Sequence, residues 1–161
     1  ISLEVVSLLI ERWPGALVEK CHEGNTPLHI ACAHGAELDV ITMLLDNLPE
    51  AIGERNNAGE SPFDGARYIS EDTDKCLFYV SSLFQNEMCN NSPCPKEIMT
   101  FFAGIQWWNG VVMLLDKCPE KIVQITNVDI LTMPEFLSMV GRCCKVTTMW
   151  EVLLNTQDLF E

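Results

Sequence analysis

The chain repeats itself at intervals of 35 residues. The segment LEVVSLLIERWPGAL, from Leu3, aligns with LDVITMLLDNLPEAI, from Leu38, and a further shift of 70 brings in NGVVMLLDKCPEKI, from Asn109. The 35-residue offset also aligns GNTPLHIA, from Gly24, with GESPFDGA, from Gly59. A fixed period of this length is typical of repeat architectures, in which each unit buries its apolar face only against its neighbours. The sequence therefore predicts a stack of small, similar units.

Local signals predict two helices and a hairpin in each unit. Thr26 and Ser61 suit the N-cap position, and each precedes a proline, so a short helix is predicted to start at both. A second helix follows and ends before Pro49. Residues 50–60, EAIGERNNAGE, carry the Asn, Gly and charged residues of an exposed turn. The apolar positions of the second helix are Val40, Ile41, Leu44, Leu45 and Leu48.

Residues 24–52, GNTPLHIACAHGAELDVITMLLDNLPEAI, resemble an ankyrin repeat. The resemblance lies in the TPLH tetrapeptide that begins at Thr26, the alanine and glycine at Ala31 and Gly35, and the apolar spacing of the second helix. The LPEAI ending is similar to a variant type with a Pro-x-Ala ending. The resemblance is specific over residues 1–70, although Asp64 stands where the family has histidine, and it weakens after residue 70.

The resemblance implies an all-α fold, an ankyrin-type helical repeat solenoid of roughly four and a half helix pairs in a single domain. Residues 1–13 have the spacing of a second helix without a first helix before it, so we expect the chain to begin inside a repeat, truncated at its N-terminus. The expected parts are the second helix and hairpin of a partial repeat (1–23), a repeat (24–58), a divergent repeat with a loop insertion (59–93), a divergent repeat (94–128) and a C-terminal helix pair (129–161).

Two histidines and a cysteine in the TPLHIACAH segment raise the alternative of a metal or catalytic site. His29, Cys32 and His34 point to different sides of one short helix, so they cannot all face one zinc ion. The resemblance instead gives His29 a scaffold role, with hydrogen bonds within and between repeats. No nucleophile with an adjacent base and no glycine-rich phosphate loop accompanies them. We therefore expect no catalytic residue, no metal site and no cofactor.

Two further segments leave alternatives open. Cys89 and Cys94 bracket the segment CNNSPC, which is either a redox switch, half of a zinc site, or an insertion loop whose thiols are unrelated. Residues 98–115 form an uncharged run of 18 residues, the lower limit for crossing a bilayer. Gln106 and Asn109 lie in its middle, where hydrocarbon would be deepest. Two helices joined by a turn therefore explain the run better than a membrane span.

Charge constrains the partner. The chain has 10 basic and 23 acidic residues and a formal net charge of −13, which repels nucleic acid and anionic lipid. A protein partner with a basic or apolar surface is favoured. The 8 cysteines include the adjacent pair Cys143 and Cys144 and indicate reduced thiols, so we expect an intracellular, cytoplasmic location.

The resemblance implies a protein–protein interaction module or scaffold, without catalysis in these residues. The alternatives are a regulatory segment of a larger enzyme and a membrane-attached ankyrin protein. The family binds partners through its hairpin tips and the inner face of its first helices. The corresponding positions here are His22, Glu23, Asn25, Ala33, His34, Asn57, Ala58, Glu60, Tyr68 and Ile69.

Overall fold

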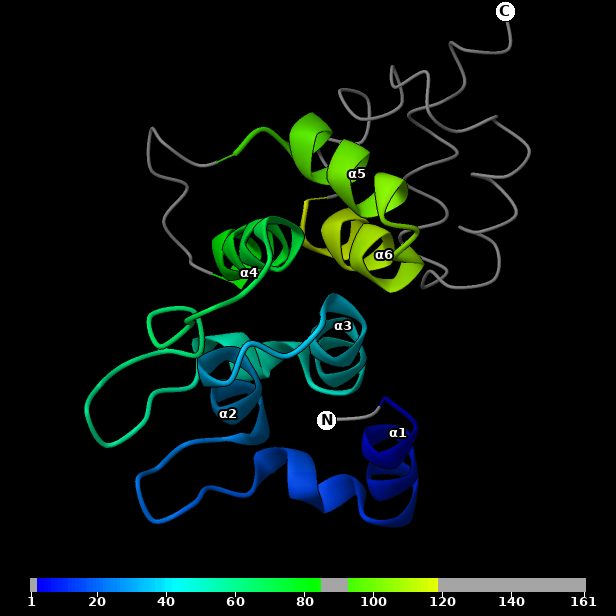
Figure 1. The fold of residues 1–161 in the computed structure, drawn as a ribbon. Helices are drawn as coiled ribbons and strands as arrows, with labels where there is room; N and C mark the ends of the chain where they lie inside the picture. Colours follow the sequence, from blue (N-terminus) through cyan, green and yellow to red (C-terminus); the bar gives the residue numbers. More distant parts are fainter. Residues whose placement is uncertain (1–2, 85–92, 119–161) are drawn as a thin grey trace, which may run out of the picture. The chain divides into compact units, whose positions relative to one another are not determined.

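The computed structural model describes residues 3–84 and 93–118, and all regular elements in these two stretches are helical (Figure 1). The predicted all-α fold is confirmed for them. The chain divides into two compact units, residues 1–89 and residues 90–161, and each is described by itself. The elements of the first unit are α1 (Leu3–Arg12), η1 (Pro14–Val18), α2 (Pro27–Ala33), α3 (Leu38–Asn47), η2 (Pro49–Gly53) and α4 (Glu71–Phe84); those of the second are α5 (Pro95–Gly104) and α6 (Trp108–Lys117).

The first unit is built as successive layers. In Figure 1, α1 packs against α3 and η1 lies beside α2, while η2 and α3 contact α4. Residues 24–58 form the predicted helix, turn, helix and hairpin. Pro14 follows α1, and Pro49 follows α3. Each proline also starts a short 3₁₀ helix, η1 or η2, which the sequence did not predict.

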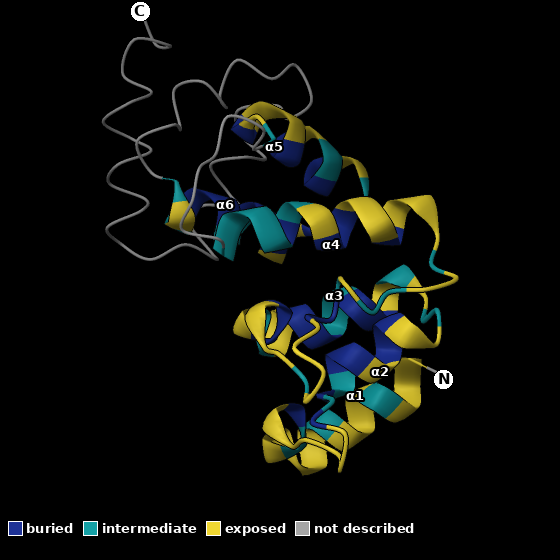
Figure 2. Ribbon diagram, turned by 90° about the vertical axis from the view of Figure 1, so that its left-hand side faces the viewer, coloured by how far each residue is buried: buried dark blue, intermediate teal, exposed yellow. Residues whose placement is uncertain are grey.

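The core of this unit lies along α3. Val40, Ile41, Leu44 and Leu45 are all buried, as predicted, whereas Leu48 is only half-buried. Each fully buried aliphatic side chain contributes about 1.5–3 kcal/mol. Figure 2 shows the contrast with α1, which has no buried residue.

At three caps of the described residues, a polar side chain three residues after the cap accepts a hydrogen bond from the cap backbone. His29 Nδ1 accepts from the N–H of Thr26 at 3.2 Å. Asp64 Oδ2 accepts from Ser61 at 2.9 Å. In the second unit Glu97 Oε2 accepts from Cys94 at 3.3 Å. Three different side chains therefore satisfy the same otherwise unpaired backbone donor.

The prediction of a short helix that starts at Ser61 is wrong. Ser61 does cap its segment, and its hydroxyl accepts from the N–H of Asp64 at 3.2 Å, but residues 62–65 make only a single turn. Gly65 is a poor helix former in the position where a further turn would begin. Tyr68 then takes a left-handed backbone with φ of 57°, which a helix cannot include. The chain next enters α4, whose first turn carries the acidic residues Glu71, Asp72 and Asp74.

The second unit confirms the predicted helix, turn and helix within residues 98–115, as α5 and α6. The ring of Trp107 is buried against Phe102, with centroids 4.9 Å apart and an edge-to-face angle of 79°. Trp107 therefore fills the core of this unit, whereas Trp108 is 38% exposed. No described helix is long and apolar enough to span a bilayer.

Several sequence-based predictions lie outside the described residues. They concern Cys89, the adjacent cysteines 143 and 144, and the C-terminal helix pair of residues 129–161. The single domain, the division into repeats and the start of the chain inside a repeat all stay predictions.

The two nitrogens of His29 connect neighbouring repeats. Because Nδ1 accepts from Thr26, Nε2 carries the proton and donates to the carbonyl of Glu60 at 3.1 Å. His29 is 4% exposed, so loss of its side chain leaves the buried N–H of Thr26 unpaired, whereas the carbonyl of Glu60 keeps its bond from the N–H of Asn56. We expect His29→Ala to lower the free energy of unfolding by about 1–3 kcal/mol in denaturant titrations. His34→Ala, at an exposed position, is the control and should change it by less than about 0.5 kcal/mol. Equal losses would contradict the bridging role.

Candidate protein-binding surface

The two hairpins of the first unit share one backbone geometry. In the first, the N–H of Cys21 donates to Asn25 at 3.0 Å; in the second, Asn56 donates to Glu60, also at 3.0 Å. A tighter turn lies inside each hairpin, closed by the N–H of Gly24 or Gly59. The second hairpin thus repeats the hydrogen-bond pattern of the first after 35 residues, and Figure 1 shows both extending from the same side of the unit.

The hairpins are also joined to each other. Asn57 donates from its backbone to the carbonyl of Glu23 and from its side chain to the carbonyl of His22, both at 3.0 Å. The side chain of Asn56 donates to the amide oxygen of Asn25 at 2.9 Å. The structure therefore brings together four residues that the sequence assigned to the surface, and it fixes the register between their two loops.

Asn56 organises the second hairpin, although sequence reasoning did not include it. Its side-chain oxygen accepts from the backbone N–H groups of Ala58 and Glu60, each at 3.0 Å. An asparagine that bonds to backbone groups two residues ahead forms an Asx turn, a common use of this residue in loops. The Asn-Asn-Ala-Gly sequence contained that signal.

An ion pair adds a second link between the two hairpins, at their bases. Lys20 lies 2.7 Å from Glu54 and also donates to the carbonyl of Arg55 at 3.3 Å. The hydrogen bond from Lys20 lowers the pKa of Glu54. Both side chains are about half exposed, so the pair contributes little to stability but helps to orient the loop.

The remaining predicted positions lie around the other end of α2. Ala33 and His34 are exposed there, and Tyr68 is 93% exposed. The backbone N–H of Arg67 donates to the carbonyl of Cys32 at 3.3 Å, which brings the residues before α4 to this helix end. Ile69 is half-buried.

The predicted surface therefore consists of two clusters. The hairpin cluster contains His22, Glu23, Asn25, Asn57, Ala58 and Glu60, and the helix-end cluster contains Ala33, His34, Tyr68 and Ile69. The length of α2, roughly 10 Å for its seven residues, separates them. Ile30, on that helix, is 38% exposed and was not among the predicted surface positions.

The buried thiols of this unit have no reactive character. Burial raises the pKa of Cys32 to about 12, and burial with smaller contributions from nearby groups does the same for Cys76. Both thiols are protonated at neutral pH, and a protonated thiol is a poor nucleophile and metal ligand. Among the residues that the structure describes, no three His, Cys, Asp or Glu side chains are grouped to hold a metal ion.

Comparison with known families agrees with this geometry. Residues 23–57, which include α2 and α3 and reach from the first hairpin into the second, match the family model of the ankyrin repeat. The chain contains an ankyrin repeat. No curated protein and no solved structure matches the chain. Ankyrin repeats generally mediate protein–protein interactions.

The glycines of the two hairpins, Gly24 and Gly59, allow a matched test of the contact between the hairpins. Gly24 and Gly59 have φ of 79° and 80°, which any other residue adopts at a cost of about 1–2 kcal/mol. A Cβ at Gly24 would also lie 2.8 Å from the backbone nitrogen of Asn57, whereas a Cβ at Gly59 meets no atom within 4 Å.

We expect Gly59→Ala to lower the free energy of unfolding by about 1 kcal/mol. Gly24→Ala should lose at least about 1 kcal/mol more, because the neighbouring hairpin must separate. Equal losses in denaturant titrations would contradict the contact.

Proposed function

We propose that this chain is a protein-interaction module and that it binds its partner through the hairpin and helix-end clusters of residues 22–69. The observation that carries the proposal is the direct joining of the two hairpins by Asn56 and Asn57. Binding orders loops at an entropic cost, and loops already held in one register avoid most of it. A recognition surface made of loops on a fixed scaffold is also the common arrangement for binding proteins.

Exposed side chains give this surface the features of a binding site. Tyr68 is 93% exposed, and tyrosine is among the residues that contribute most to binding free energy. Ile30 adds apolar area on α2, and Ile69 adds it in the helix-end cluster, whereas the hairpin cluster is mainly polar. Protein interfaces commonly combine apolar anchors with polar surroundings.

The charge of the hairpins supports a partner with a basic surface. Residues 19–25 and 54–60 carry four carboxylates, Glu19, Glu23, Glu54 and Glu60, and two cations, Lys20 and Arg55. Complementary charge speeds association and selects against acidic partners. The proposal includes no catalytic role and no nucleic acid. It places the protein in the reducing interior of the cell, in the cytoplasm, which the free thiols of Cys21, Cys32, Cys76 and Cys94 support.

The test replaces His22, Glu23, Tyr68 and Ile69 together with alanine. A partner is first captured with the wild-type chain and identified by mass spectrometry, and its affinity is then measured by calorimetry. We expect the fourfold variant to bind at least about 100-fold more weakly, because it loses an aromatic anchor and its neighbours. The unfolding midpoint should change little, since these side chains are not core residues.

The matched control replaces Glu4, Glu11 and Asp39, which are exposed on α1 and α3. Its affinity should stay within about threefold of wild type, since it leaves both clusters intact. An unchanged affinity in the fourfold variant would eliminate this surface. Equal weakening in both variants would attribute binding to overall charge instead.

A further inference from the structure

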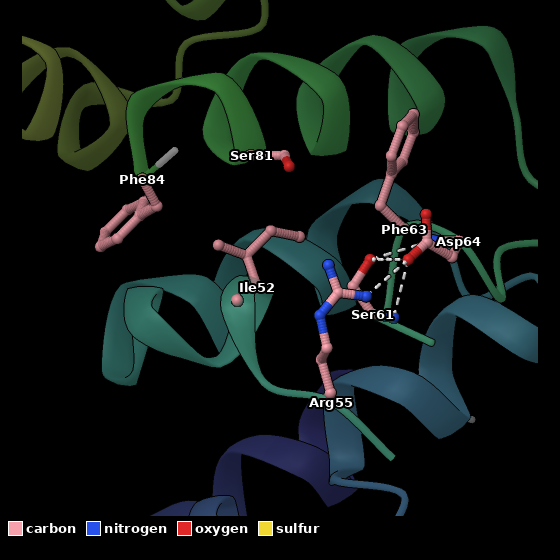
Figure 3. Close-up of a pocket in the computed structure, with 8 residues that line it drawn as sticks. Ile52, Arg55, Ser61, Phe63, Asp64, Ser81 and Phe84 are labelled. Carbon is pink, nitrogen blue, oxygen red and sulfur yellow. Dashed lines mark hydrogen bonds and ion pairs between the residues drawn. The ribbon is translucent and has the colours of Figure 1, made fainter. Parts of the chain in front are cut away.

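A pocket of about 240 Å³ lies within the first unit, and none of its lining residues belongs to either cluster. Figure 3 shows its lining, which comes from η2, the second hairpin, the single turn after Ser61 and the end of α4. Its apolar walls are Ile52, Phe63 and Phe84, and its polar groups are on Arg55, Ser61, Asp64 and Ser81. Gly53 completes the lining, and a Cβ built there would meet no atom within 4 Å.

The guanidinium of Arg55 is the central polar group of this pocket. In Figure 3 it lies between the side chains of Ile52 and Ser61. Its Nη1 donates to the carbonyl of Gly59 at 2.6 Å and lies 3.4 Å from Asp64 Oδ2. Within the described part of the chain, the hydrogen bonds of this guanidinium all come from Nη1, so the donors on Nη2 and Nε are open to a ligand.

Asp64 holds this arrangement in place. Its Oδ2 accepts from the backbone N–H of Ser61 at 2.9 Å and from the Ser61 hydroxyl at 2.8 Å. These two bonds are the main reason that its pKa is lowered, and Arg55 adds a smaller effect. The carboxylate is therefore ionised at neutral pH and offsets the positive charge of Arg55 beside it.

We propose that the pocket receives one tyrosine side chain of the protein partner, with its hydroxyl accepting a hydrogen bond from Arg55. The volume favours a single ring, because a cavity of roughly 150 Å³ already holds benzene, whereas sites for larger ligands begin at about 300 Å³. A guanidinium beside apolar walls suits an aromatic ring, whose face attracts a cation.

The polar groups select tyrosine over other side chains. A lysine or arginine would bring a second cation to Arg55, and a carboxylate would meet the ionised Asp64. Phenylalanine leaves the open donors of Arg55 without an acceptor, and the tryptophan N–H can only donate. A phenol is neutral, has an apolar body and accepts at its oxygen. The net charge of −13 further favours basic residues beside that tyrosine in the partner.

This inference rests on the proposed function, since the ring belongs to a protein partner, but its test does not need the partner. N-acetyl-L-tyrosinamide is titrated into the ¹⁵N-labelled chain, and amide shifts are followed by NMR. We expect saturable shifts at Gly53, Arg55 and Ser61, with a dissociation constant on the order of 1 mM. N-acetyl-L-phenylalaninamide should bind about tenfold more weakly, because it lacks the acceptor. N-acetyl-L-lysinamide should not bind.

Variants connect the shifts to the pocket. Gly53→Leu adds a side chain into open space at the pocket wall and should abolish the shifts, whereas Gly104→Leu makes the same change at another open position, in α5, and should leave them intact. Arg55→Met keeps the apolar stem and should remove the difference between the tyrosine and phenylalanine probes.

Equal binding of both probes to the wild-type chain, shifts confined to other residues, or shifts that survive in Gly53→Leu would each overturn the pocket assignment. If the fourfold variant binds the partner as tightly as wild type while the probes still bind the pocket, the proposed surface is wrong and the pocket assignment is unaffected.

Discussion

The hydrogen bonds of His29 are the constraint on which the first unit depends. One ring nitrogen accepts from the N-cap of α2, and the other donates to the carbonyl of Glu60 in the next hairpin. A single buried side chain thus fixes both the start of a helix and its distance from the following repeat. Thr26, also buried, provides the other half of the cap, and no buried side-chain donor or acceptor in the described residues is left without a partner. A repeat stack has few long-range contacts, so such bridges determine how well neighbouring units cooperate.

The joined hairpins follow from that bridge. Once Glu60 is held by His29, the loop before it lies against the preceding loop, and Asn56 and Asn57 can reach the carbonyl and amide groups of residues 22–25. These bonds use side chains that sequence reasoning assigned to partner binding. Asn25 and Asn57 therefore join the two hairpins as well as lying on the predicted binding surface, whereas His22 and Ala58 remain at the exposed tips.

Periodic features were predictable from the sequence, and aperiodic ones were not. The 35-residue offset and the cap residues predicted α2, α3 and the hairpins, because each depends on side chains within a few residues of one another. The failed helix after Ser61 has a local cause too, in Gly65 and Tyr68, but its cap signal was as good as that of Thr26. The Asx turn of Asn56 has a local signal, but its bond to Asn25 and the pocket between residues 52–64 and the end of α4 depend on contacts distant in sequence, which no local pattern encodes.

The pocket shows how a different residue at one repeated position changes the contacts of its neighbours. Arg55 is the counterpart of Lys20 at the 35-residue offset, and Asp64 is the counterpart of His29. Lys20 crosses to Glu54 in the next hairpin, beside a smaller cavity of about 130 Å³ lined by Leu17, Thr26 and Leu48. Arg55 instead turns back to Asp64, because a carboxylate now stands where the first repeat has the imidazole of His29. The exchange of histidine for aspartate at this repeated position therefore brings the guanidinium of Arg55 into the pocket. Its counterpart Lys20 makes a contact between hairpins, whereas Arg55 has hydrogen-bond donors that are open to a ligand.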